Sequence, residues 1–235
     1  MTTVRSALVA LLAFALVLLG GASLAQAGSA EVERAQKRLN VLGCAAGPAD
    51  GVLGERTRAA LVRFQAANRL AQSGRLTSTT RTRLTGDRAR RCDVRRMPAN
   101  SGQGRRIVLS QRQNYVWLVR KGGSVLAQGP MIDNPSYLGT GSYHTGPQCG
   151  RAGRIPRNSD YGSSLWLYKF VRFANCGVGF HRVPVYKSTG AQIHGDHLLG
   201  TNYRESHGCI RLSQRLSERV WTFTAARTKV VVVHG

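Results

Sequence analysis

Apolar side chains recur at helical spacing in the first third of the chain. Residues 32–42 place valine, alanine and leucine three or four positions apart, and Gly43 follows where such a helix would end. The same spacing predicts a second helix over Glu55–Ala67 and a third from about residue 77 to residue 84. The pattern therefore predicts a small all-α module of three helices, which we place at residues 31–86.

After residue 105 the apolar period changes to two, which is typical of strands. Strands are expected at 107–109, 115–119, 125–131, 165–173, 178–185, 191–194 and 229–233, with a hairpin turn at 121–123 and one helix at 213–224. Short strands with a single late helix predict a mainly-β, sandwich-like domain over residues 105–235. Residues 87–104 are rich in arginine and contain glycine and proline, so we interpret them as a basic linker.

The first 27 residues have the pattern of a signal peptide. Arg5 supplies a positive charge, an apolar run covers residues 7–19, and Ala25-Gln26-Ala27 forms a cleavage site of the A-x-A type. The apolar run is short for a membrane span, which needs about 20 residues. An uncleaved anchor is the alternative. We expect the protein to be secreted across the cytoplasmic membrane, into the periplasm or the cell wall.

The chain is strongly basic. It carries 34 Lys and Arg against 11 Asp and Glu, a formal net charge of +23, spread along its length without a long basic run. A nucleic-acid binder is disfavoured by the leader and by the lack of a stripe of basic and aromatic residues. An exported protein of this charge would instead be drawn to anionic wall polymers or to phospholipid headgroups.

Five cysteines in an exported chain predict disulfides and one remaining thiol. If Cys209 is the free cysteine, the other four can pair in three ways. We favour Cys44 with Cys92, which would tie the start of the linker back to the helical module, and Cys149 with Cys176, which stays within the β domain.

Cys209 lies in the heptapeptide Ser206-His207-Gly208-Cys209-Ile210-Arg211-Leu212. A thiol attacks as its thiolate, so a nucleophilic cysteine needs a nearby base or positive charge. Gly208 has no side chain and lets a substrate carbonyl approach, and the Gly208 and Cys209 amides would face a developing oxyanion. Taken alone, Cys209 is equally consistent with half of a disulfide or a buried small residue.

The whole heptapeptide resembles the active-site signature of the L,D-transpeptidases, also called YkuD-type enzymes, which remodel peptidoglycan. The resemblance covers about residues 105–233 and implies a mainly-β catalytic domain with Cys209 as nucleophile. It implies attack on a tetrapeptide stem with release of the terminal D-alanine, formation of a thioester and transfer to an amine, which gives a 3→3 cross-link. It also implies acylation by carbapenems.

A second resemblance covers nearly all of residues 31–86. Residues 50–54 read Asp-Gly-Val-Leu-Gly and are followed by Thr57, Ala60 and Phe64-Gln65. This pattern is similar to the three-helix peptidoglycan-binding module and implies targeting to the wall. Most of the matching residues are of the kind that determines a fold, so the resemblance identifies no sugar-contacting residue, and such a module can also serve as a spacer.

Two histidines compete for the role of base. His181 stands in a Gly-x-x-x-His-x-x-Pro context from Gly177 to Pro184, which resembles the strand that carries the family's base. His194, in Ile193-His194-Gly195, resembles another family element. We favour His181, which would make His194 a rim residue on an inserted hairpin. His207 adjoins Cys209 and is expected to shape its turn.

Substrate contacts are expected from Arg211, Ser206, Tyr161 and His194. Arg211 follows the nucleophile by two positions, and its planar guanidinium suits a substrate carboxylate, although it could equally be a surface arginine. Tyr161 lies in Asp160-Tyr161-Gly162, a sequence typical of a loop that could face the site.

Three alternatives stay open at this point. With water as acceptor the enzyme would be an L,D-carboxypeptidase, and with a degenerate catalytic domain it would be a non-catalytic wall-binding protein. A zinc site built from His194, His197, His207 and Cys209 is the third. We expect no cofactor and no metal, a monomeric protein, and peptidoglycan stem peptides and glycan as its partners.

Overall fold

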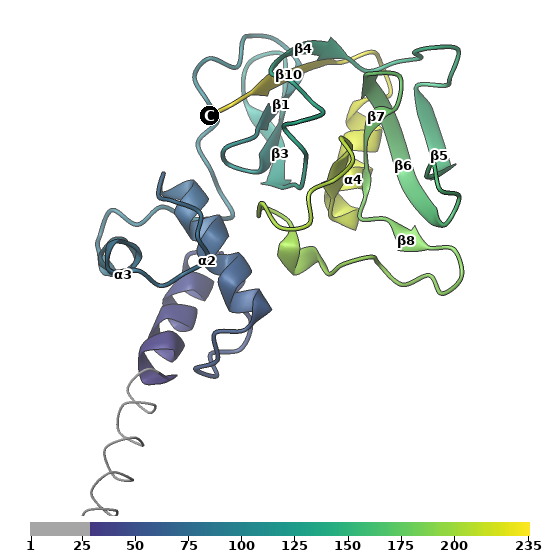
Figure 1. Ribbon diagram of the computed structural model, residues 1–235. Helices are drawn as coiled ribbons and strands as arrows, with labels where there is room; N and C mark the ends of the chain where they lie inside the picture. Colours follow the sequence, from purple (N-terminus) through teal and green to yellow (C-terminus); the bar gives the residue numbers. More distant parts are fainter. Residues whose placement is uncertain (1–28) are drawn as a thin grey trace, which may run out of the picture.

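The computed structural model describes residues 29–235, and the predicted signal peptide lies outside them. Figure 1 shows a small helical module followed by a larger domain of two sheets. The module consists of a helix over residues 29–41, α2 (Glu55–Ala67) and α3 (Ser78–Thr85). Within residues 29–235, no helix has the length and apolar character to span a membrane.

Local sequence explains where the helices of the module begin and end. Gly43 has φ +69°, a left-handed conformation that favours glycine after a helix. The Thr77 side chain caps α3 by accepting the Thr80 amide. Leu39, Leu61 and Phe64 then fill the apolar core between the helices. The predicted three-helix module is confirmed.

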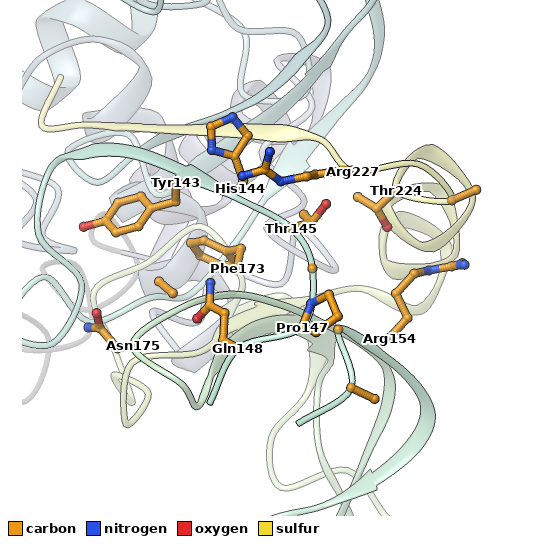
Figure 2. A pocket seen from close by; sticks show the side chains of 15 residues that line it. Tyr143, His144, Thr145, Pro147, Gln148, Arg154, Phe173, Asn175, Thr224 and Arg227 are labelled. Carbon is orange, nitrogen blue, oxygen red and sulfur yellow. The ribbon is translucent and has the colours of Figure 1, made fainter. Parts of the chain in front are cut away.

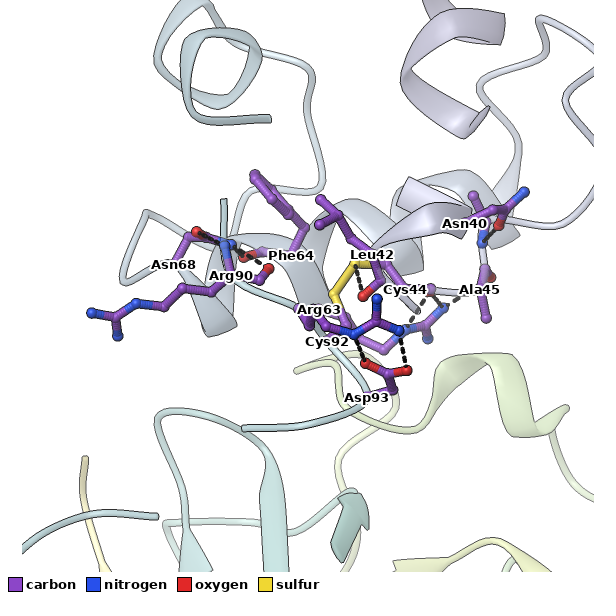
Figure 3. The surroundings of a disulfide bond; sticks show 12 residues. Asn40, Leu42, Cys44, Ala45, Arg63, Phe64, Asn68, Arg90, Cys92 and Asp93 are labelled. Atoms are coloured by element: carbon purple, nitrogen blue, oxygen red, sulfur yellow. Dashed lines mark hydrogen bonds and ion pairs between the residues drawn. A yellow bond between two sulfur atoms is a disulfide. The ribbon is translucent and has the colours of Figure 1, made fainter. Parts of the chain in front are cut away.

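Polar residues of the second resemblance hold the turn before α2. The Gln36 side-chain amide donates to Asp50 Oδ1 at 2.8 Å and to Thr57 Oγ1 at 2.9 Å, while its oxygen accepts the Gly51 amide at 2.9 Å. These residues therefore act as fold determinants. The disulfide Cys44–Cys92, drawn in Figure 3, joins the end of the first helical segment to the stretch after α3.

The first sheet has the order β3-β2-β1-β10-β4. Its strands are β1 (Arg106–Ser110), β2 (Tyr115–Val119), β3 (Val125–Pro130), β4 (Gly141–His144) and β10 (Lys229–Val233). β1 pairs with β10 in parallel, and the other neighbours are antiparallel.

The second sheet has the order β5-β6-β7-β9, with β8 paired to β6. Its strands are β5 (Arg154–Ser159), β6 (Leu165–Ala174), β7 (Val178–Arg182), β8 (Val185–Tyr186) and β9 (Ile210–Leu212). The parallel pairing of β7 with β9 is the one that builds the site described below.

The helix α4 (Gln214–Phe223) packs between the two sheets (Figure 1). Ser213 caps it, as expected, by accepting the Leu216 amide, and Leu216, Val220 and Phe223 enter the apolar core shared with both sheets. The predicted combination of a helical module and a mainly-β domain of two layers is confirmed.

Several stretches differ from the strand prediction. The strand expected over residues 178–185 is divided into β7 and β8, and β9 (Ile210–Leu212) was not predicted, because its three residues are too few to show an alternating pattern. Residues 191–194 form no strand but a turn with a single bridge from Gln192 to Val185, followed by the short 3-10 helix η1 (Asp196–Leu198). β4 and β5 were not predicted, because Gly141–His144 and Arg154–Ser159 are polar or interrupted by proline and lie at sheet edges, where alternation is weak.

The stretch expected to be a linker packs against the first sheet. Arg95 is 5 % exposed, and its backbone oxygen accepts the Trp117 indole N–H at 3.0 Å. The Asp93 backbone oxygen accepts the Tyr115 hydroxyl at 2.7 Å. Met97 joins the same aromatic cluster. Residues 93–97 therefore cover the outer face of β2.

One buried arginine joins the module to the domain of two sheets. Arg63 of α2 is 5 % exposed and donates to Cys44 O at 2.9 Å within its own module. Its Nη1 also donates to the backbone oxygens of His197 and Leu199, the latter at 3.1 Å. Ala59 of α2 packs on Leu199 beside it. The interface thus combines apolar contact with a cation that is satisfied by carbonyls from both sides.

Candidate active site

An open cleft of about 1390 Å³ lies on the second sheet. Cys209, His181, His194, Arg211 and Arg172 all line it. The structure therefore brings both histidines considered for the base to the same cavity as the candidate nucleophile. Tyr161, on the loop between β5 and β6, also lines this cleft and is fully exposed.

The pairing of β7 with β9 sets the arrangement of the site. His181 is paired with Arg211, and Phe180 is paired with Ile210. One step back in the same register, Cys209 comes opposite Gly179. Because side chains two positions apart on a strand point to one face, Cys209, Arg211 and His181 share a face of the sheet.

The turn before Cys209 is held by buried polar groups. Gly208 has φ +113°, where a side chain would be strained, and a Cβ there would lie 3.1 Å from the Tyr137 Cβ. Ser206 is 2 % exposed, and its Oγ accepts the Gly208 amide at 2.9 Å. Asn134 Nδ2 donates to Ser206 O at 2.8 Å.

Two residues of the heptapeptide therefore differ from their expected roles. Ser206 uses its hydroxyl to build the turn, and the Gly208 amide points to that hydroxyl, which leaves the Cys209 amide as the expected donor to an oxyanion. His207 is exposed and lines the mouth of the cleft.

Cys209 is a half-buried thiol. Its Sγ donates to Gly177 O at 3.6 Å. Burial raises the pKa of the Cys209 thiol above its ordinary value, and the Gly179 backbone, Arg211 and Arg172 oppose that rise. At neutral pH the resting cysteine is therefore a thiol flanked by two cations that favour its thiolate.

His181 is buried, with 2 % of its surface exposed. Its Nδ1 lies 2.6 Å from Arg182 O, so Nδ1 carries the hydrogen and Nε2 keeps its lone pair. Burial lowers the pKa of His181 to about 4, the Arg182 carbonyl opposes this, and Arg211 adds to it. The imidazole is thus neutral at physiological pH and oriented by a carbonyl, as a base requires.

His194 is 7 % exposed and lines the cleft. Its Nδ1 is 3.1 Å from Gly195 O, and its buried Nε2 has no hydrogen-bond partner among residues 29–235. Burial lowers the pKa of His194 as well. It is therefore a second neutral imidazole among the residues that line the cleft.

Arg211 lines the cleft and uses one of its guanidinium nitrogens within the protein. Its Nη1 donates to Arg204 O at 2.9 Å, and burial lowers its pKa while the charge of Cys209 raises it. Arg172 on β6 is the second cation near the thiol. Sequence analysis missed Arg172, because it reaches the site through the pairing of Arg172 with Gly179 across two strands, which no local motif records.

The zinc alternative is not supported. His197 is directed to α2, where its Nε2 lies 3.1 Å from Glu55 Oε2. Across residues 29–235, no three histidine, cysteine or acidic side chains gather in a way that could hold a metal ion.

Both favoured disulfides are confirmed. Cys44 is bonded to Cys92 and Cys149 to Cys176, which leaves Cys209 as the free cysteine of the five. Residues next to the second disulfide, Asn175 and Gly177, line the cleft. A neighbouring pocket of about 730 Å³, shown in Figure 2, shares Ala152 and Asn175 with it.

Comparisons with known proteins agree with this architecture. The family model described as L,D-transpeptidase catalytic domain matches residues 93–232, and the model described as putative peptidoglycan binding domain matches residues 28–84. The first match begins where residues 93–97 start to cover β2. A search of curated proteins found no match.

Several solved structures are similar to the chain. An L,D-transpeptidase from Stackebrandtia nassauensis is 17% identical, with 86% of this chain and 90% of that chain covered and a TM-score of 0.46. An L,D-transpeptidase from Xylanimonas cellulosilytica is 20% identical, with 86% and 93% covered and a TM-score of 0.46. The family match over residues 93–232, joined to the geometry of the cleft, shows that this chain belongs to the L,D-transpeptidase catalytic-domain family and carries a peptidoglycan-binding-type module ahead of it.

Proposed function

We propose that the protein is an exported L,D-transpeptidase that forms 3→3 cross-links in peptidoglycan through a thioester on Cys209. The family assignment supports a transferase acting on peptidoglycan. The observation that carries the finer proposal is that a free thiol and a neutral, oriented imidazole line one cleft. Cys209 is the cysteine without a disulfide partner, and His181 Nδ1 donates to a backbone carbonyl.

In the first half-reaction, Cys209 Sγ attacks the carbonyl carbon between the third and fourth residues of a tetrapeptide stem. Before substrate binds, the Cys209 thiol and the His181 imidazole are both neutral. Nε2 of His181 therefore takes the thiol proton as the S–C bond forms. The same proton then passes to the departing nitrogen. The C–N bond breaks, D-alanine leaves, and a thioester remains.

In the second half-reaction, a side-chain amine of a diamino acid on another stem attacks the thioester carbon. His181 takes a proton from that amine and returns it to Sγ as the S–C bond breaks. The product is the 3→3 amide bond. Water in place of the amine would give a carboxypeptidase. The volume of the cleft, about 1390 Å³, supports the binding of two peptides and therefore the transpeptidase.

Positive charge assists both steps. Arg211 and Arg172 favour the thiolate electrostatically, and the free donors of Arg211 suit a stem carboxylate. The Cys209 amide is the donor proposed for the oxyanion. His194, with an unpartnered Nε2, and Tyr161 on the exposed loop are proposed as further substrate contacts.

The module and the leader support a location at the wall. We propose export by residues 1–27 and retention by the module, with the net charge of +23 drawing the protein to anionic wall polymers.

Intact-mass spectrometry tests the proposal. The mature protein is incubated with a disaccharide-tetrapeptide and separately with a carbapenem, beside Cys209→Ala. We expect a mass increase that disappears in Cys209→Ala, and cross-linked muropeptides among the products. If a folded wild-type protein with a titratable thiol gains no mass from either compound, the chain is a wall-binding protein. Hydrolysed tripeptides without cross-links would identify a carboxypeptidase.

A further inference from the structure

The Cys149–Cys176 disulfide joins two segments that border the candidate nucleophile. Cys149 lies on the loop between β4 and β5, and Cys176 lies on the tight turn between β6 and β7. Both half-cystines are exposed. Asn175, on the same turn, lines the main cleft and also the neighbouring pocket, which Figure 2 shows. Ala152, three residues after Cys149, lines both cavities as well, so the disulfide joins two segments that the cavities share.

The turn supplies two carbonyls that bear on Cys209. Gly177 O accepts the Cys209 thiol at 3.6 Å. Cys176 O accepts a hydrogen bond from Nη1 of Arg172, one of the two cations that favour the Cys209 thiolate. The position of this turn therefore affects both the carbonyl that accepts the thiol and one of the two cations near it.

The other arm of the disulfide holds Arg172 from the opposite side. Ala152 O accepts Nε of Arg172 at 3.1 Å, and Gly153 O accepts its backbone amide at 2.8 Å. Arg172 is 2 % exposed. Its guanidinium is thus fixed between the two segments that the disulfide ties together.

The backbone at the disulfide is in an unfavourable conformation. Cys149, Asn175 and Cys176 have φ of 51°, 46° and 57°, the left-handed region that residues with a side chain rarely adopt. Such residues persist where the surroundings over-determine them. Here the covalent bond joins two of the three, and it acts together with the Cys176 amide, which donates to Gln148 Oε1 at 3.3 Å, to hold the turn in this shape.

We propose that Cys149–Cys176 is a positioning disulfide for the nucleophile, which holds the Gly177 carbonyl and the Arg172 guanidinium in place around Cys209 Sγ. The inference rests on the proposed function, since it concerns the same thiol. Without the bond, the turn relaxes out of the left-handed region and Arg172 loses its Cys176 acceptor. The Cys209 thiolate then loses a fixed cation.

Alkylation of Cys209 by iodoacetamide tests this without any substrate. The rate is measured against pH by peptide mass spectrometry in three proteins: wild type, Cys149→Ser/Cys176→Ser, and Cys44→Ser/Cys92→Ser as the matched control. We expect the midpoint of the Cys149→Ser/Cys176→Ser profile to rise by about one pH unit, with a roughly tenfold slower reaction at neutral pH. The control keeps the wild-type midpoint. Equal midpoints in wild type and Cys149→Ser/Cys176→Ser, with circular dichroism showing both folded, would overturn the proposal.

Two further measurements keep the test decisive if the variant does not fold. Mild dithiothreitol treatment of the wild type reduces exposed disulfides first, and Cys44 and Cys92 are 0 % and 3 % exposed, so Cys149–Cys176 opens alone. After removal of the reagent, the Cys209 profile of this protein should show the same rise, and an unchanged profile contradicts the proposal. Arg172→Gln with the disulfide intact should show the same rise in the midpoint of Cys209 alkylation. A midpoint equal to that of wild type would show that Arg172 is not the group that the disulfide positions. If Cys209 of the wild type is alkylated at the expected rate but forms no acyl-enzyme, the transpeptidase proposal is refuted. The result on the disulfide is then still valid, because alkylation needs no substrate.

Discussion

His181 on β7 and Arg211 on β9 are direct partners in the parallel pairing of their strands. The cation beside the imidazole adds to the effect of burial, and together they lower the pKa of His181 to about 4. Proton transfer from Cys209 to His181 is therefore uphill at rest, and it becomes favourable only as the sulfur forms its bond to substrate. Before substrate binds, Cys209 and His181 are therefore a neutral thiol and a neutral imidazole, not a thiolate–imidazolium ion pair.

The two histidines of the cleft should differ in their effect on acylation. We expect His181→Ala to slow acylation of Cys209 by roughly 100-fold or more, the usual contribution of a general base, and His194→Ala to slow it less than about tenfold. Stopped-flow acylation by a carbapenem measures both. Wild-type rates in His181→Ala, with a large loss in His194→Ala, would transfer the role of base to His194.

Burial of neutral His181 makes stability depend on pH. The pKa of His181 is about 4 in the folded protein against an ordinary value of 6.5, so the unfolded chain binds more protons between those values. The contribution is fully present above pH 6.5 and is lost as pH falls towards 4, by roughly 3 kcal/mol. Urea unfolding at pH 7 and pH 4.5 should show a smaller loss in His181→Gln than in wild type. Equal losses would mean that His181 is not the responsible group.

Gly179 has no side chain, and the Phe170 ring that stacks on His181 lies where a Cβ would be. A Cβ there would lie 2.7 Å from Phe170 Cζ, and the Phe170 ring stacks on His181 with centroids 6.2 Å apart. We expect Gly179→Ala to displace Phe170 and slow acylation roughly 10- to 100-fold. Gly122→Ala, on a turn where a Cβ meets no atom within 4 Å, is the control. An unaffected Gly179→Ala would show that Phe170 shifts without moving His181.

Arg63 should be a large contributor to stability. Arg63→Met would leave the buried carbonyls of Cys44 and Leu199 without their donor, and we expect a loss of roughly 3 kcal/mol or more, since each unsatisfied buried group costs about 1–3 kcal/mol. Urea unfolding measures the change. Arg58→Ala, on an exposed position of α2, should stay within about 0.5 kcal/mol of wild type. Equal midpoints for the two variants would refute this account of the interface.

The local sequence was sufficient to predict the helices whose apolar spacing or capping residue can be recognised directly. Glu55–Ala67 matches α2 to the residue, and Ser213 caps α4 as expected. Alternation located β2 but misjudged its surroundings: all five residues of Tyr115–Val119 are buried, because residues 93–97 cover the face that alternation would leave to solvent. Contacts between distant segments of that kind leave no periodic trace in a sequence.

The same limit applies to the site. Cys209 and His181 were found because each stands in a recognisable local sequence, and both line the cleft. Arg172 and Gly179 were missed, because their importance arises from strand register, which places Arg172 opposite Gly179 and Gly179 opposite Cys209. Ser206 was assigned to substrate, but its burial and its bond to the Gly208 amide are properties of the folded turn.

Arg63 also bears on how the two parts of the molecule move. Because a side chain of α2 binds carbonyls at the end of η1, this buried contact resists rotation of the module against the catalytic domain. A glycan strand bound by the module would meet the cleft at one distance and one angle. The protein would then reach successive stem peptides by stepping along the strand instead of swinging on a tether, and the spacing of its cross-links would reflect its own dimensions.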